Sequence, residues 1–146
     1  MKIDFYFSYR SPYSYLILPR VLDLKNNYKI DINFKLVYPL AIREPEFFKG
    51  KNFLTYFFYK IRDMRSVAKQ LDMPFFTPRP DPIKQSYLTG KIADEQPYIF
   101  DLCHIGQQAA QEGLGIEIAY ELSSLIFGTK GGWNEESTLD KAFAKV

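Results

Sequence analysis

The first 38 residues constrain the fold most, because their hydrophobic pattern changes from a period of two to a helical pattern and back again. Within residues 3–7, Ile3, Phe5 and Phe7 alternate with Asp4 and Tyr6. This period of two is typical of a half-buried strand. Helix-compatible sequence follows from Tyr13 to about Leu24, and alternation returns over about 29–38. A strand, a helix and a second strand normally form a right-handed parallel unit. The opening therefore predicts an α/β fold.

The rest of the chain favours helices. We expect helices over about 52–71, 94–112 and 116–127 and from Ser137 to the last residue, and loops over 41–50 and over 73–82, which holds four prolines. Two evident strands make too small a sheet to be stable without further cover. We therefore expect an incomplete domain, or one that borrows sheet from a partner, and the alternative is a compact, mostly helical domain.

The composition excludes several classes of protein. Lysine and arginine number 19 against 17 acidic residues, and a net charge of +2 argues against a nucleic-acid-binding protein. No stretch approaches the ~20 apolar residues of a membrane span. The single cysteine, Cys103, excludes a disulfide framework and a multi-cysteine metal site, so we expect no metal and a reducing compartment such as the cytoplasm.

The start of the first helix carries the clearest chemical signal. Ser11 followed by Pro12 is typical of a helix N-cap and first helical position, and capping alone explains the pair. A helix start also stabilises an anion, because its N–H groups are free and the macrodipole is positive there. Residues 11–14, Ser-Pro-Tyr-Ser, stand where a Cys-x-x-Cys would, so thiol exchange is excluded, but a hydroxyl can still donate to a ligand's thiolate.

The run DFYFSYRSPYSYL over residues 4–16 resembles the opening of the 2-hydroxychromene-2-carboxylate isomerases and the related kappa-class glutathione transferases. These families are DsbA-like members of the thioredoxin superfamily. Looser similarity continues through residues 59–78, Phe127-Gly128 and the loop at Trp133. The resemblance implies a thioredoxin-like fold, with a β-α-β N-terminal half in residues 1–40 and an inserted helical domain in residues 41–146. It also implies that the C-terminal thioredoxin half, with its Val-Pro turn, is missing.

The resemblance implies a function as well, namely a glutathione-dependent cis-trans isomerase that acts on an intermediate of aromatic catabolism. Ser11 matches the catalytic serine, whose hydroxyl interacts with the glutathione sulfur. Pro12 and Tyr13 match positions that line the same end of glutathione, and Asn52 is the nearest match to an asparagine that contacts it. The implied ligands are glutathione and a small aromatic carboxylate, with no nucleic acid or membrane partner, and a homodimer is compatible with the resemblance.

Two other functions remain open at this point. A kappa-type glutathione transferase would use the same thiolate on other electrophiles, and an inactive remnant would serve only as a binding module. Arg10, at the turn before Ser11, either attracts a carboxylate substrate or is a solvated loop residue.

Other reactive residue types have ordinary structural interpretations. Cys103 and His104 are adjacent in a predicted helix and point about 100° apart, so they form no catalytic pair. The charges at Arg62, Asp63 and Arg65 are expected to be solvated. The aromatic pairs at 47–48, 57–58 and 75–76 are expected in the core, or lining an apolar pocket between the helical region and the Ser11 turn.

Overall fold

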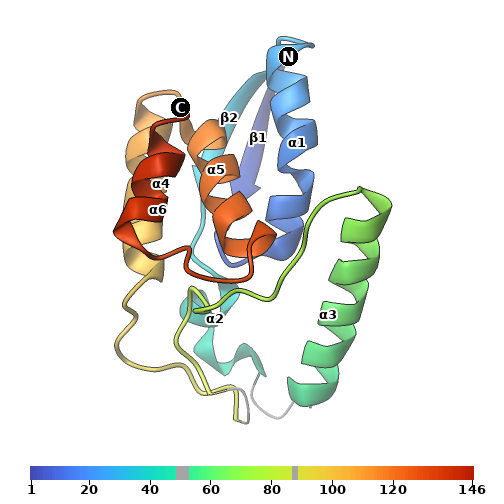
Figure 1. Ribbon diagram of the computed structural model, residues 1–146, viewed down its shortest axis with the longest axis vertical. Helices are drawn as coiled ribbons and strands as arrows, with labels where there is room; N and C mark the ends of the chain where they lie inside the picture. The colour runs from blue at the N-terminus through green and yellow to red at the C-terminus, as the bar shows by residue number, and fades with distance from the viewer. Residues whose placement is uncertain (49–52, 87–88) are drawn as a thin grey trace.

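The computed structural model describes residues 1–48, 53–86 and 89–146, and Figure 1 shows the order of its elements. In chain order these are β1 (Lys2–Phe7), α1 (Pro12–Asn26), β2 (Asp31–Leu36), α2 (Leu40–Arg43), the 3-10 helix η1 (Pro45–Phe48), α3 (Phe53–Gln70), α4 (Ile99–Gln111), α5 (Gly115–Gly128) and α6 (Glu136–Phe143). β1 and β2 pair in parallel, with Phe5 opposite Phe34. The predicted α/β class and its parallel strand–helix–strand unit are therefore confirmed.

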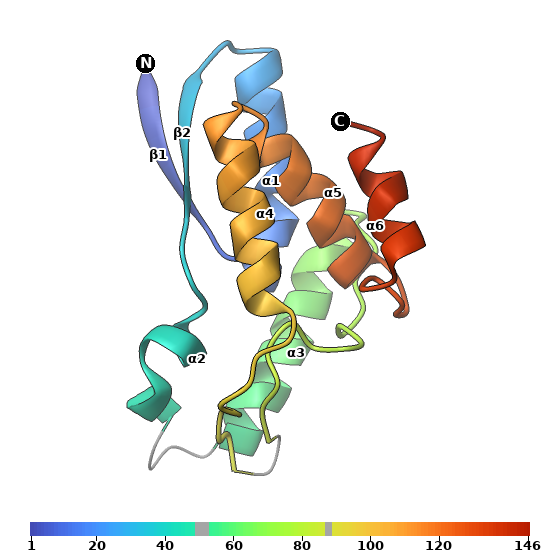
Figure 2. The same ribbon diagram turned by 90° about the vertical axis from the view of Figure 1, so that its left-hand side faces the viewer.

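The two faces of this sheet differ in the way that the alternating sequence predicts. Phe5, Phe34 and Leu36 pack against the buried core, and Figure 2 shows α1, α4 and α5 on one side of the sheet. On the other face, the Asp4 carboxylate accepts hydrogen bonds from Asn33 at 2.8 Å and from Lys35 at 2.7 Å. Because side chains alternate across a strand, residues of one type share one face.

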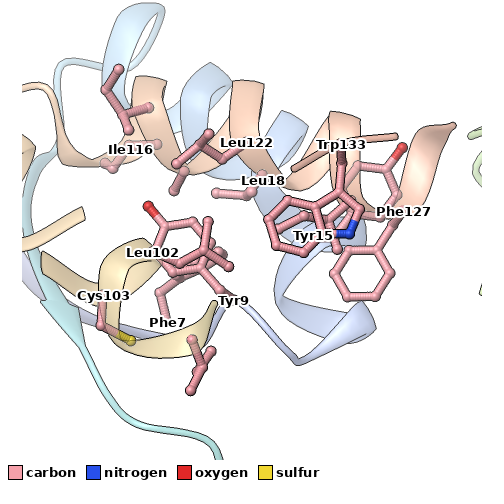
Figure 3. Close-up of a cluster of buried hydrophobic side chains, with 14 of the residues drawn as sticks. Phe7, Tyr9, Tyr15, Leu18, Leu102, Cys103, Ile116, Leu122, Phe127 and Trp133 are labelled. Atoms are coloured by element: carbon pink, nitrogen blue, oxygen red, sulfur yellow. The ribbon is translucent and has the colours of Figure 1, made fainter. Parts of the chain in front are cut away.

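One cluster of buried side chains joins the sheet to the helices, as Figure 3 shows. Its largest members come from the end of β1, from α1, from the helical region and from the loop before α6: Phe7, Tyr9, Tyr15, Leu18, Leu102, Ile116, Leu122, Phe127 and Trp133. Residues on both sides of the predicted division at residue 40 thus share one core. The division into 1–40 and 41–146 itself stays a prediction.

The predicted loop over 41–50 is wrong in part, because α2 and η1 lie there. Each has only 4 residues, which is too short to produce a periodic hydrophobic pattern. The second strand is shorter than predicted, and α6 ends at Phe143, before the end of the chain.

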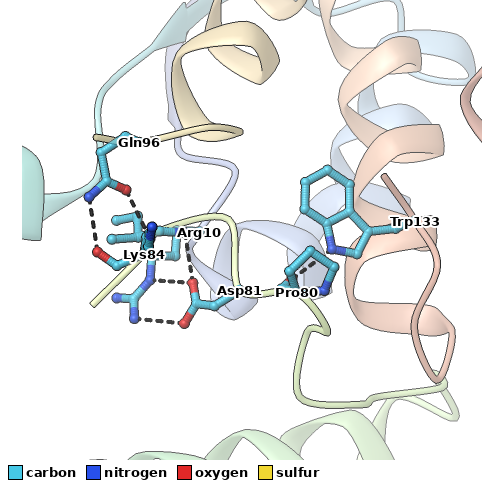
Figure 4. Close-up of polar contacts among 7 residues, drawn as sticks. Arg10, Pro80, Asp81, Lys84, Gln96 and Trp133 are labelled. Carbon is cyan, nitrogen blue, oxygen red and sulfur yellow. Dashed lines mark hydrogen bonds and ion pairs between the residues drawn. The ribbon is translucent and has the colours of Figure 1, made fainter. Parts of the chain in front are cut away.

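Helix α4 begins five residues later than predicted, at Ile99. The side chain of Gln96 accepts a hydrogen bond from the Lys84 N–H and donates to the Lys84 carbonyl, both at 2.9 Å, as Figure 4 shows. The same amide donates to the Ala93 carbonyl at 2.7 Å. These bonds hold the segment before α4 against a distant loop, and sequence periodicity does not report such contacts.

Helix α3 lies beside the lower part of α1 and away from the sheet (Figures 1 and 2). Met64 and Ala68 are buried, whereas Phe58 and Tyr59 are 67% and 65% exposed. None of the helices in the described ranges combines the length and apolarity needed to cross a membrane.

Candidate functional site

The turn between β1 and α1 places Ser11 at the start of the helix. The Ser11 N–H donates to the Ser8 carbonyl at 3.0 Å, and the Ser11 backbone is extended. Its side-chain oxygen accepts a hydrogen bond from the Ser14 N–H at 3.2 Å, and Pro12 takes the first helical position. The predicted N-cap is confirmed. The first turn of α1 itself contains no acidic residue.

A pocket of about 380 Å³ opens beside this turn. Its walls come from the end of β1 and the turn into α1, from α2 and the segment before it, from α3, from the proline-rich loop over residues 73–82 and from Phe127 of α5. The volume falls within the range of roughly 300–1,000 Å³ that is usual for small-molecule sites. Ser11, Pro12 and Tyr13 all line the pocket, so the structure brings the three candidate residues together at one site.

Hydrogen-bonding capacity remains at this turn after the helix is capped. The Ser11 hydroxyl uses one of its acceptor positions for the Ser14 N–H, and its O–H can still donate. The hydroxyl of Ser8, also on the pocket wall, is buried and has no hydrogen-bond partner among the described residues. Capping and ligand binding by Ser11 are therefore compatible.

Tyr13 connects the start of α1 to α3. Its hydroxyl donates to the Asp63 carboxylate in a short hydrogen bond. Burial, followed by this hydrogen bond, raises the pKa of Tyr13 above its usual value, so the phenol stays neutral. The expectation that Asp63 is a solvated charge is wrong, because 50 residues of sequence separate the two partners and only the fold brings them together.

Arg10 is engaged by a carboxylate of the protein itself. Its guanidinium donates to both oxygens of Asp81, at 2.9 and 3.0 Å, as Figure 4 shows. The two side chains are only 24% and 15% exposed. The prediction of a solvated loop residue is wrong, because Arg10 is paired with Asp81. A contact between Arg10 and a substrate carboxylate stays a prediction, since Arg10 also lines the pocket. The ion pair connects the turn before Ser11 to the proline-rich loop over residues 73–82, which contains Asp81.

The remaining sequence candidates are distributed as follows. Phe57 and Phe75 line the pocket, whereas Phe58 faces solvent. Asn52 and the side chain of Phe48 lie outside the described residues. Cys103 is buried, which raises the pKa of its thiol to about 12 and makes it unreactive.

His104 is exposed beside the buried Cys103, so the two side chains do not act together. Within the described ranges, no group of three histidine, cysteine, aspartate or glutamate side chains is placed to hold a metal ion.

A parallel β-α-β unit, a helix that starts at a pocket and a following set of helices make up the α/β fold of the described residues, as the predicted thioredoxin-like fold of the DsbA type requires. The fold matches the solved structure of a 2-hydroxychromene-2-carboxylate isomerase with a TM-score of 0.69 and 18% sequence identity. The match covers 99% of this chain and 65% of that one. The predicted resemblance is thus confirmed for the fold. No family model and no curated protein sequence matches the chain.

Proposed function

We propose that the chain carries the site of a glutathione-dependent cis-trans isomerase that acts on an aromatic carboxylate of the 2-hydroxychromene-2-carboxylate type. The observation that carries this proposal is the placement of the Ser11 hydroxyl, at the start of α1, on the wall of an open pocket. The fold of the matched isomerase supports the same reaction class.

The residues of the turn fit a thiolate ligand. The Ser11 O–H is available as a donor at the start of α1. A hydrogen-bond donor and the positive end of a helix both favour the ionised form of a sulfur beside them.

Each part of the pocket then has a separate role. When bound, glutathione supplies a thiolate that adds reversibly to a conjugated double bond and so permits rotation about it. Ser11 stabilises charge on the sulfur and forms no covalent bond itself. The aromatic side chains of Phe57, Phe75 and Phe127 line the pocket and provide apolar contact for the substrate ring.

The test separates the two roles of Ser11. Ser11→Ala removes both the cap and the donor, so we expect a stability loss of about 1 kcal/mol and a fall in turnover of roughly tenfold to a hundredfold. Ser11→Asp keeps the cap, because aspartate accepts the Ser14 N–H equally well, but places a negative charge beside the sulfur. We expect this variant to be as stable as the wild type and inactive.

The assay is the glutathione-dependent conversion of 2-hydroxychromene-2-carboxylate, with thermal unfolding measured on the same samples. The ultraviolet absorbance of the bound thiolate, followed as a function of pH, reports the pKa of the bound thiol. We expect the midpoint of this titration to lie at higher pH in Ser11→Ala than in the wild type. Full activity in Ser11→Asp would refute the role of Ser11. Activity of the wild type with neutral electrophiles and none with the carboxylate would indicate the transferase instead. The predicted cytoplasmic location is consistent with a supply of reduced glutathione.

A further inference from the structure

We infer that Lys60 binds the carboxylate of the substrate in this pocket. The choice of ligand rests on the proposed function, whereas the assignment of the residue rests on the charges that line the pocket. Lys60 belongs to α3 and lines the pocket, with its ammonium close to the ring of Tyr13. Neither the sequence pattern nor the fold comparison singles it out.

The ammonium group of Lys60 is held by aromatic rings and by no carboxylate. Its Nζ lies 4.7 Å from the centre of the Tyr13 ring and 5.7 Å from that of Tyr56. In the described part of the chain Lys60 forms no ion pair, and the nearby Asp63 carboxylate accepts the Tyr13 hydroxyl. The faces of aromatic rings attract a cation and fix its position without neutralising it. Lys60 is therefore a positioned cation with no direct carboxylate partner among the described residues.

The other charged residues on the wall are less suited to this role. Arg10 and Asp81 form a bidentate pair and compensate each other. Arg43 is exposed, and its Nε donates to the Tyr38 carbonyl at 2.9 Å. Among the described lining residues Asp81 is the one acid, so the pocket as a whole is positively charged. An anionic ligand is favoured, and Lys60 is its half-buried partner.

The aromatic side chains around Lys60 also favour a ligand that carries an aromatic ring beside its carboxylate. Tyr13 and Tyr56 flank its ammonium, and Phe57 lies on the pocket wall in the same helix. A flat aromatic ring contacts these side chains while its carboxylate pairs with Nζ. Such a pair is stronger than one in open water, because the rings exclude solvent from one side of the charge. The combination fits an aromatic carboxylate better than a neutral aromatic compound.

The experiment compares binding of trans-cinnamate with binding of its neutral amide, cinnamamide, by calorimetry in the absence of glutathione. For the wild type we expect tighter binding of the carboxylate. Lys60→Met should weaken cinnamate binding roughly tenfold and leave cinnamamide binding unchanged, because a hydrogen bond to a charged group is lost. Lys60→Arg should restore most of the preference.

Lys69→Met is the matched control, because Lys69 is exposed on the same helix and lies outside the pocket. Equal cinnamate affinity in the wild type and Lys60→Met, an equal loss in both methionine variants, or no preference in the wild type would each overturn the assignment. Glutathione binding to Lys60→Met should match the wild type. A wild type that binds cinnamate through Lys60 but converts no substrate with glutathione would refute the proposed function and leave this inference intact.

Discussion

Helices α5 and α3 both flank α1, yet they use their apolar residues in opposite ways. α5 is buried along its length and supplies eight buried residues. α3 buries Met64 and Ala68, turns Phe57 toward the pocket and leaves Phe58 exposed. The apolar side chains of α5 stabilise the fold, whereas those of α3 form a surface that a ligand can contact. Similar helical periodicity thus supports two different tasks.

The largest expected effect comes from a substitution in α5 that creates a cavity in the core. Leu122 is 1% exposed in the core, so Leu122→Ala should lower the free energy of unfolding by about 2–5 kcal/mol. Phe58→Ala in α3 is the control, because the 67% exposed ring should change stability by no more than about 0.5 kcal/mol. Urea unfolding measures both, and similar losses in the two variants would contradict the division of roles.

A second test introduces a methyl group where α4 packs against Tyr9 in the core. A Cβ at Gly106 in α4 would lie 2.6 Å from the Tyr9 hydroxyl and 2.8 Å from a ring carbon of the same side chain. Gly106→Ala should therefore cost about 1–3 kcal/mol, although alanine favours helix. Adding Tyr9→Phe removes the closest atom and should recover part of the loss. A Gly106→Ala protein more stable than the wild type would show that this packing is loose.

The smallest expected effect concerns Tyr15, which contacts both regions. Its ring stacks on Phe127 of α5, and its hydroxyl donates to the Pro74 carbonyl, after α3, at 3.0 Å. Burial raises the pKa of Tyr15 from 10.0 to about 12. Between these pH values the native state binds more protons than the unfolded state, so the free energy of unfolding falls as pH rises.

Tyr15→Phe should cost about 1 kcal/mol at neutral pH and show a shallower alkaline decline. The slope should not vanish, because burial also raises the pKa of Tyr9. Urea unfolding at neutral pH and above pH 10 measures the change. If Tyr15→Phe left the pH dependence of the free energy of unfolding unchanged, Tyr15 would have the same pKa in the native and unfolded states.

The elements that the sequence predicts well are those with local signals. α5 runs from Gly115 to Gly128, within one residue of its expected bounds at each end, because its apolar run is long and ends at a glycine. The start of α4 was missed because the bonds of Gln96 to Lys84 depend on a loop 12 residues away. Local patterns carry no information on such contacts.

The candidate site divides in the same way. The Ser11 cap and Pro12 were predictable, since both signals lie within four residues. The partners of Arg10 and Tyr13 were not, because Asp81 and Asp63 lie 71 and 50 residues further along the chain. The sequence located the helix start, and only the fold revealed which charges surround it.

The pairing of Arg10 with Asp81 has a consequence for biosynthesis. A ribosome delivers the N-terminal residues first, so the turn before Ser11 leaves the exit tunnel long before its counterion has been translated. Until then the guanidinium remains hydrated and one wall of the pocket does not exist. Phe127, a further part of the wall, arrives later still. A nascent chain can thus form β1 and α1 early, but the pocket gains its full set of walls only after Phe127 has been translated.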